Sequence, residues 1–407
     1  MQRRRVSSLK YRNHNSIFQV MIRRALEPRL KELARQFPAV LLLGPRQCGK
    51  TTLVRHFVDA RYFDLERPSD SQFFASDVEY ALRRLERPLI LDEAQALPEL
   101  FPVLRSIIDD ARRKPGQYYL LGSVSPVLVK SISESLAGRI GILELTPFLY
   151  GEVAGRRGMT FEALWLRGGY PDAFLAKSAE GWRNWHESYT RTFIERDIAR
   201  HQLSLSASDM RRLLTMLAHQ HGGLLNHSDL GRSLGCSYHT VQSAIDLFVG
   251  YFIVRRLEPY HANLGKRLVK APKVYLRDSG LLHHLLGIGT ADALLTSPAR
   301  GNSFEGFMIQ QIAAMEEIRR PGSRFYFFRT HAGAEIDLIV DRGSERIGIE
   351  FKAGTAIEPR DSANLRRGIE DGVIQRGIIA YQGSRRFEPR EGVSVIPAET
   401  ILEAPLD

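Results

Sequence analysis

The stretch Gly44-Pro45-Arg46-Gln47-Cys48-Gly49-Lys50-Thr51 decides the first domain of this 407-residue chain. It has the spacing G-x-x-x-x-G-K-T and lies between a short apolar run at 39–43 and a segment, 51–58, whose apolar residues recur at helical spacing. A strand, this loop and a helix together form a phosphate-binding site, because consecutive backbone N–H groups can turn inward at a helix N-terminus. The stretch therefore predicts a nucleotide site on an α/β domain.

The side chains of this loop have distinct predicted roles. The Lys50 ammonium neutralises the β- and γ-phosphates of ATP, and the Thr51 hydroxyl ligates Mg²⁺. The Cys48 thiol lies beside a helix N-terminus and Lys50, which both favour the thiolate, although burial would oppose this, and we expect maleimide to modify it unless MgATP protects it. The residues predicted to bind ATP here are Gly44, Pro45, Arg46, Gln47, Cys48, Gly49, Lys50, Thr51 and Thr52.

A pair of carboxylates follows further along the chain. The apolar run Leu89-Ile90-Leu91 ends in Asp92 and Glu93, and Asp92 lies 42 residues after Lys50 (92 − 50). Alone, such a pair is common where a strand end meets solvent. Together with the phosphate-binding loop, it predicts that Asp92 holds Mg²⁺ through water and that Glu93 is the general base that polarises the attacking water.

Two accessory residues each have two interpretations. Ser123, just after the apolar run 118–121, either lies near the γ-phosphate or caps an ordinary strand end. Arg139, at the end of Ser135-Leu136-Ala137-Gly138-Arg139, either reaches a phosphate, in cis or from a neighbouring subunit, or is a surface charge. We include Ser123 among the ATP-binding residues and Arg139 among the catalytic ones.

Strand-like and helix-like segments alternate from Met21 to about residue 155. Apolar residues between 100 and 111 recur at helical spacing, and short apolar runs predict strands at 39–43, 62–65, 88–91 and 118–121. This alternation is typical of a mainly parallel sheet with helices on both faces. We expect residues 21–155 to form an α/β domain of the P-loop NTPase class.

The pattern becomes mostly helical between residues 156 and 270. A capped helix at 226–234, a turn, a second helix at 238–248 and a strand at 251–257 have the dimensions of a winged helix. The second helix offers few side chains suited to base readout, which favours packing against protein or contact with the DNA backbone over sequence-specific DNA binding. The arginines available for backbone contact are Arg211, Arg212, Arg255 and Arg256.

From residue 271 to 407 the pattern is α/β again. It predicts a helix at 304–312 and strands at 325–328, 335–340, 346–352 and 376–381.

Polar residues on two of these strands predict a second site. The two-residue period of a strand places Glu350 and Lys352 on one face, and a hairpin would bring Asp337, which lies 13 residues earlier (350 − 337), beside them. Two carboxylates can hold Mg²⁺ while a lysine positions a water, with Glu305 on the preceding helix as a third carboxylate. The alternative is an ordinary strand with a solvated Glu/Lys face.

The sequence resembles prokaryotic AAA-type ATPases that carry a C-terminal domain of unknown function with a restriction-nuclease-like core. The resemblance covers most of the chain from Met21 onward and implies ATP binding and hydrolysis without supplying a substrate. Cys48 departs from the family pattern, which has a small aliphatic residue there. The matching segments are Gly-Pro-Arg-Gln-Cys-Gly-Lys-Thr-Thr-Leu (44–53), Leu-Asp-Glu-Ala-Gln (91–95), Gly-Ser (122–123), Ser-Leu-Ala-Gly-Arg (135–139), Gly-Gly-Tyr-Pro (168–171), Glu-Ile-Asp-Leu-Ile-Val (335–340) and Ile-Glu-Phe-Lys (349–352).

Composition limits the class of protein further. No apolar run approaches the roughly 18 residues of a membrane span, so we expect no membrane contact. Two cysteines without zinc-site spacing favour a reduced, cytoplasmic location. The net charge of +11 permits contact with nucleic acid without demonstrating it. Part of that charge lies in residues 1–20, which we expect to be a disordered basic extension or to precede the true start at Met21.

The leading hypothesis is a cytoplasmic Mg²⁺-dependent ATPase that couples nucleotide state, through a winged-helix module, to a nuclease-like C-terminal domain. The alternative is a DNA-binding or DNA-processing protein, a metal-dependent nuclease, in which ATP acts as a switch. A third hypothesis is a nucleotide-gated scaffold with negligible ATP turnover. The expected ligands are ATP and Mg²⁺. Non-specific contact with the DNA backbone, a homo-oligomer and a protein partner are left open.

Overall fold

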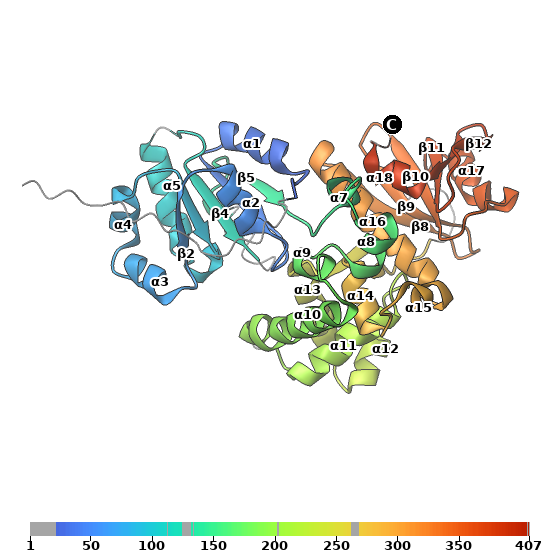
Figure 1. Cartoon of the computed structure of the whole chain (residues 1–407), viewed down its shortest axis with the longest axis horizontal. Coiled ribbons are helices and arrows are strands. Elements are labelled where there is room, and N and C mark those ends of the chain that lie inside the picture. The colour runs from blue at the N-terminus through green and yellow to red at the C-terminus, as the bar shows by residue number, and fades with distance from the viewer. Residues whose placement is uncertain are drawn as a thin grey trace, which may run out of the picture.

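The computed structural model describes residues 22–404 and 406, apart from 112, 124–131, 133, 202 and 262–267. The predicted basic extension, 1–20, lies outside the described residues. Figure 1 shows a blue and cyan α/β part at one end of the molecule, a green helical part, and an orange and red part built on a second sheet. None of the helices in the described part of the chain combines the length and the apolar composition that a membrane span needs.

The N-terminal part contains a five-stranded sheet in which every pairing is parallel, with the order β2-β3-β4-β1-β5. This confirms the predicted parallel sheet and its four predicted strands. The fifth strand is not predicted by the pattern, because Gly141 interrupts its apolar run and Ile142, on this edge strand, is 40% exposed. The strands are β1 (Ala39–Leu43), β2 (Arg61–Asp64), β3 (Leu89–Asp92), β4 (Tyr118–Gly122) and β5 (Ile140–Glu144).

Helices cover both faces of this sheet. Leu41, Leu89 and their neighbours on one face form a hydrophobic core with α3, α4 and α5, whereas Val40 and Ile90, which point the other way, pack against α1 and α2. The result is the α/β arrangement of a P-loop NTPase. The helices are α1 (Glu27–Gln36), α2 (Lys50–Phe57), α3 (Pro68–Ala75), α4 (Val78–Arg84), the short 3-10 helix η1 (Ala94–Ala96) and α5 (Leu100–Asp110).

The middle of the chain is helical, as predicted. The helix predicted at 226–234 is confirmed. The Asn226 side chain caps it by accepting hydrogen bonds from the first turn of α12, and the Ser237 side chain caps α13 in the same way. The strand predicted at 251–257 begins later, because Phe252 has a φ of 62° and turns the chain. The elements are α7 (Tyr150–Val153), α8 (Phe161–Arg167), α9 (Pro171–Phe174), α10 (Ala179–Thr192), the π-helix η2 (Phe193–Ile198), η3 (Ala199–His201), α11 (Ala207–His219), α12 (His227–Leu234) and α13 (Tyr238–Gly250).

A mixed eight-stranded sheet with the order β12-β13-β11-β10-β9-β8-β6-β7 dominates the C-terminal part. The four strands predicted here are confirmed, whereas β7, β12 and β13 are not predicted by the pattern. Because the sheet includes strands from both sides of residue 270, the boundary placed there stays a prediction. The strands are β6 (Val254–Pro259), β7 (Lys273–Leu276), β8 (Arg324–Arg329), β9 (Glu335–Asp341), β10 (Arg346–Lys352), β11 (Arg376–Tyr381), β12 (Phe387–Arg390) and β13 (Val393–Pro397).

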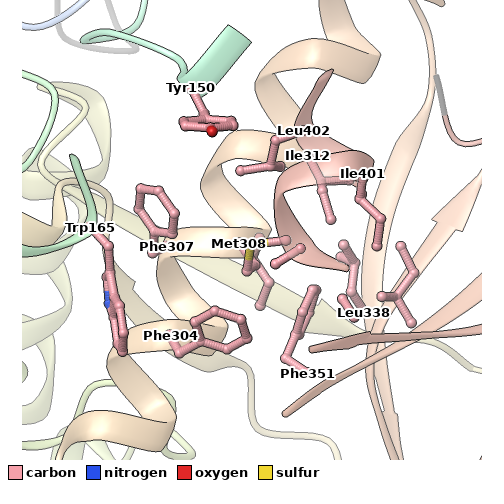
Figure 2. Packing of buried hydrophobic residues seen from close by; sticks show 14 of the residues in the cluster. Tyr150, Trp165, Phe304, Phe307, Met308, Ile312, Leu338, Phe351, Ile401 and Leu402 are labelled. Atoms are coloured by element: carbon pink, nitrogen blue, oxygen red, sulfur yellow. The ribbon is translucent and has the colours of Figure 1, made fainter. Parts of the chain in front are cut away.

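One long helix joins this sheet to the helical part. The predicted helix 304–312 is longer in the structure and runs from Arg300 to Arg319, because polar residues at its two ends, such as the buried Glu316, do not continue the apolar pattern. Figure 2 shows Phe304 and Phe307 of this helix beside Trp165 of α8, with Phe351 and α18 on the other side. The helices are α14 (Ser279–Leu285), α15 (Ala291–Thr296), α16 (Arg300–Arg319), η4 (Pro359–Ser362), α17 (Ala363–Glu370) and α18 (Ala398–Glu403).

The hydrophobic core between α16, α8 and the C-terminal sheet leads to a prediction about stability. Phe304 is fully buried and its ring lies 5.3 Å from that of Trp165, so Phe304→Ala should cost about 3–5 kcal/mol of unfolding free energy. Leu295 is 53% exposed, and Leu295→Ala should change that free energy by no more than about 0.5 kcal/mol. Urea unfolding followed by tryptophan fluorescence measures both, and equal losses would contradict this packing.

Candidate functional site

The predicted phosphate-binding loop connects β1 to α2, and its backbone requires glycine at two positions. Gly44 has a φ of 147°, and a Cβ at this position would lie only 2.2 Å from the Leu145 carbonyl oxygen. Gly49 has a φ of 100° and is the N-cap of α2. The helix therefore starts directly at Lys50, and its first N–H groups have no partner within the helix.

Lys50 lies over this loop with its ammonium almost fully buried. Its Nζ donates to the carbonyl oxygens of Gly44 and Pro45, both at 2.9 Å, and to Ser123 Oγ at 3.0 Å. The structure thus brings together Lys50 and Ser123, which are 73 residues apart in the sequence.

Hydroxyl and carboxylate oxygens meet at the start of α2. Thr51 Oγ1 donates to Asp92 Oδ2 at 2.7 Å, and the Tyr62 hydroxyl donates to the same oxygen at 3.0 Å. Oxygen ligands of these two kinds are those that Mg²⁺ prefers beside nucleotide phosphates. Thr51 and Asp92 therefore fit the predicted Mg²⁺ bound with ATP. Tyr62 is an additional partner that its place in an apolar run does not reveal.

Glu93 follows Asp92 in a left-handed backbone conformation, with φ 51° and ψ 46°. This conformation allows its N–H to donate to Asp92 Oδ1 at 2.9 Å, while the Gln95 amide donates to Glu93 Oε2. Burial raises the pKa of Glu93 above its ordinary value, and the charges of Lys50 and Arg46 oppose that rise. A half-buried carboxylate with a raised pKa next to the loop is suited to accept a proton.

A cavity of about 620 Å³ opens over the loop, within the range of ligand pockets. Its opposite wall comes from the helical part of the chain, including Asp172, Tyr189 and Phe193. The predicted residues that line the cavity are Arg46, Gln47, Gly49, Lys50, Thr51, Thr52, Asp92, Glu93 and Ser123.

Ion pairs connect the loop to the far wall of the cavity. Arg46 lies 3.0 Å from Asp197 of the π-helix η2 and 3.2 Å from Glu66. Glu66 in turn pairs with Arg196 at 2.5 Å and with Arg200 at 2.8 Å. Sequence patterns do not reveal these pairs, because about 130 residues separate Glu66 from its partners in the helical part.

Three parts of the chain match described families. Residues 36–154 match an AAA domain, and residues 159–292 and 300–401 match the domains of unknown function DUF8612 and DUF4143. The uncharacterized proteins Rv2008c of Mycobacterium tuberculosis and Mb2031c of Mycobacterium bovis are each 40% identical to the chain over 383 residues, which cover 93% of it and 84% of each relative. The chain belongs to the family of these proteins. Its AAA domain supports an ATP-binding protein of the P-loop ATPase class.

A solved structure, the Walker-type ATPase PABY2304 of Pyrococcus abyssi, aligns with 65% of this chain and 96% of its own at 14% identity and a TM-score of 0.45.

A buried arginine that the sequence pattern misses supports the phosphate-binding loop of the AAA domain. Arg24 donates from Nη1 to the Cys48 carbonyl oxygen at 2.9 Å and from Nη2 to that of Thr146 at 2.6 Å. Its Nε donates to Glu152 Oε2 at 3.0 Å, so the guanidinium and its counter-ion are both buried. In the sequence, Arg24 has no feature that separates it from the exposed Arg23 beside it.

The expectation of a reactive thiolate at Cys48 is wrong. The side chain is fully buried against the last strand of the AAA domain, and Sγ donates to the Leu145 carbonyl oxygen at 3.3 Å. Burial raises the pKa of the thiol, and this effect exceeds the opposing charges of Lys50 and Arg24. The neighbouring cations that the sequence pattern identifies are present, but burial has the larger effect.

Arg139 lies away from the nucleotide cavity. Its guanidinium pairs with Asp109 through Nε at 2.8 Å and Nη2 at 2.7 Å, and it is not among the described residues that line the cavity. A phosphate contact made by Arg139 in a neighbouring subunit stays a prediction.

The arginines considered for DNA contact are engaged within the chain. Arg211 forms a two-point ion pair with Glu187, and Arg256 lies 2.7 Å from Asp246 of α13. Arg255 is half-buried and donates to Gln310. These pairs reduce the positive charge that this surface offers to a phosphate backbone.

The predicted hairpin of the C-terminal domain is confirmed. Strands β9 and β10 pair antiparallel, with Leu338 opposite Ile349, and the Asp337 carboxylate accepts a hydrogen bond from Phe351 N at 2.9 Å. Lys352 lies 3.4 Å from Glu350, on the face predicted from the strand period. Burial, together with the charges of Glu305 and Glu350, raises the pKa of Asp337.

The carboxylates around this hairpin do not fit the predicted second metal ion. Glu305 pairs with Lys273 at 2.9 Å rather than facing an open coordination site. Within the described ranges, no group of three or more His, Cys, Asp or Glu side chains is placed to hold a metal ion. Lys273 is the residue that sequence reasoning missed, since a lone lysine at the start of a short strand has no signal of its own.

The two cysteines should differ in reactivity. Cys236 is half-exposed whereas Cys48 is buried, so N-ethylmaleimide should modify Cys236 at least about ten times faster in the native protein. Peptide mass spectrometry at increasing times measures both rates, and Cys236→Ser should leave only slow labelling. Rapid labelling of Cys48 that MgATP prevents would contradict the burial described above.

Proposed function

We propose that this chain is an Mg²⁺-dependent ATPase that couples its nucleotide state to a nuclease-like C-terminal domain. The observation that carries the proposal is the 2.7 Å hydrogen bond between Thr51 and Asp92, within a nucleotide-sized cavity that also contains the Lys50 ammonium. The match of residues 36–154 to an AAA domain supports it. A cytoplasmic location and an oligomeric or protein partner belong to the same proposal.

Nucleotide binding requires a rearrangement of Lys50. Its ammonium exchanges the carbonyl oxygens of Gly44 and Pro45 for the β- and γ-phosphate oxygens, while the N–H groups at the start of α2 hold the phosphates from below. Thr51, together with Asp92 through water, would hold Mg²⁺, which would neutralise phosphate charge when bound.

Glu93 is the proposed base for hydrolysis. Its carboxylate takes a proton from the attacking water as the water approaches the γ-phosphate, while the hydrogen bond from Gln95 holds the side chain in place. Its raised pKa increases its affinity for that proton. Ser123, which contacts the Lys50 ammonium, is placed to orient the γ-phosphate side of the site.

Arg46 is the proposed route of coupling. A phosphate in the loop competes with Asp197 and Glu66 for its guanidinium, so nucleotide binding changes an ion pair that reaches the π-helix η2. We assign residues 21–155 to the ATPase domain, 156–270 to the helical module and 271–407 to the C-terminal domain. The order α12, α13 and the β6–β7 pair supports a winged helix in this module.

A DNA-processing protein in which ATP is a switch is the second candidate. It is favoured by the convergence of Asp337, Glu350 and Lys352 on the β9–β10 hairpin, in a domain with the element order α16, β8, β9, β10, α17, β11. Stimulation of ATP turnover by DNA, or cleavage of DNA that depends on Mn²⁺, would support this candidate over the first.

Substitutions at Lys50 and Glu93 should separate binding from turnover. Lys50→Ala removes a charge-assisted phosphate contact worth about 1.5–3 kcal/mol and should weaken ATP binding at least tenfold. Glu93→Gln should keep binding and lower phosphate release by roughly 10²–10⁴. Titration with a fluorescent ATP analogue and a phosphate-release assay measure the two effects. The exposed residues Lys31 and Glu99 supply matched controls, Lys31→Ala and Glu99→Gln, which should behave as the parent.

The pH dependence of turnover should report the environment of Glu93. A base works only when deprotonated, so turnover should fall as the pH drops through its pKa, at a value above the ordinary 4.5. Arg46→Gln removes a positive charge that lowers this pKa, so the acid limb should move to higher pH. Profiles of kcat against pH test this. An acid limb that moves to lower pH in Arg46→Gln would be inconsistent with Glu93 as the base.

A further inference from the structure

A buried lysine lies inside the C-terminal carboxylate cluster. Lys273 begins β7, and only 4% of its side chain is exposed. Its Nζ lies 2.9 Å from Glu305 Oε1 and 2.6 Å from Glu335 Oε1, and 5.6 Å from the centre of the Phe327 ring. A single ammonium thus bridges Glu305, which was expected as a metal ligand, and Glu335, which lies on the same strand as the expected ligand Asp337.

Each carboxylate of the cluster has a partner within the chain. Glu305 also accepts a hydrogen bond from the Tyr275 hydroxyl, and Glu335 also lies 3.5 Å from the Arg329 guanidinium.

The remaining two carboxylates are held on the hairpin itself. Asp337 accepts a hydrogen bond from Phe351 N, and Glu350 pairs with Lys352 and accepts a weak hydrogen bond from Asn364 at 3.4 Å. Buried carboxylates that lie close together are costly unless cations or hydrogen bonds compensate them. Here ammonium groups and N–H donors of the chain provide that compensation.

We propose that Lys273 is the resident cation of this cluster, and that it takes the place of a divalent metal ion between Glu305 and the β9 carboxylates. The inference rests on the nuclease-like core of the proposed function and not on its ATPase part. It goes beyond that proposal because it makes the cluster a structural site that binds no metal ion.

Lys273 lies near the start of the C-terminal domain, and its backbone pairs with residues of the helical module. Lys273 pairs with Leu257 of β6, the strand that follows α13, and it also forms an isolated bridge with Leu224, just before α12. Backbone pairing with two residues of the helical module therefore positions Lys273, whereas α16 and β9 supply the carboxylates.

Titration of the full chain with Mn²⁺, together with thermal unfolding, tests the proposal. The parent should give no calorimetric signal from this cluster, and its Tm should not respond to Mn²⁺. Lys273→Met leaves Glu305 and Glu335 without their shared cation, so Tm should fall by roughly 5 °C or more, and Mn²⁺ should restore part of the loss. Lys273→Met with Glu305→Gln should lose that Mn²⁺ response.

Two further variants test the proposal even if Lys273→Met does not fold. Lys273→Arg retains a cation and should keep the parent's indifference to Mn²⁺, and Lys270→Met, at an exposed lysine three residues earlier, should resemble the parent. Binding of Mn²⁺ to the parent that Glu305→Gln abolishes would overturn the proposal, as would a Lys273→Met variant with the parent's Tm. Phosphate release by the same samples reports the ATPase separately, so either proposal can fail alone.

Discussion

The rest of the structure depends on one requirement, which is that the buried positive charges around the phosphate-binding loop must be compensated by oxygen atoms of the chain. Lys50 and Arg24 are both buried, and a buried cation is stable only where oxygen atoms surround it. The loop's own carbonyl groups compensate Lys50, whereas the acidic partner of Arg24 is Glu152, in the segment that leaves the AAA domain. The phosphate-binding loop is thereby tied to the beginning of the helical part.

Arg46 also requires a compensating charge, and Asp197 on the other wall of the cavity provides it. Two parts of the chain therefore build the cavity, and Asp197 of the helical part depends on Arg46 of the ATPase domain for an opposite charge. In the C-terminal cluster, strand β7 supplies Lys273, helix α16 supplies Glu305 and strand β9 supplies Glu335. In both places an ion pair with little exposure links segments that are distant in the sequence.

The features that could be predicted from the sequence are those that depend on neighbouring residues. An apolar run followed by a glycine loop fixes β1, α2 and the position of Lys50, and the period of two along β10 places Glu350 beside Lys352. What could not be predicted depends on pairs far apart, such as Arg24 with Glu152, since nothing in a local pattern distinguishes a buried arginine from an exposed one. For the same reason burial reversed the expectation for Cys48, whose neighbouring cations were identified correctly.

These long-range pairs also explain how a nucleotide could act beyond its own domain. Asp197 is buried and pairs with the half-buried Arg46, so a phosphate that drew Arg46 toward it would leave the Asp197 carboxylate without that counter-charge. Asp197 lies in the π-helix η2, a rare helical form that occurs frequently at functional sites. Arg196 and Arg200 flank it and already pair with Glu66 of the ATPase domain. Under the coupling proposed above, η2 is therefore the element of the helical module with the most ion pairs to the ATPase domain through which nucleotide state would act.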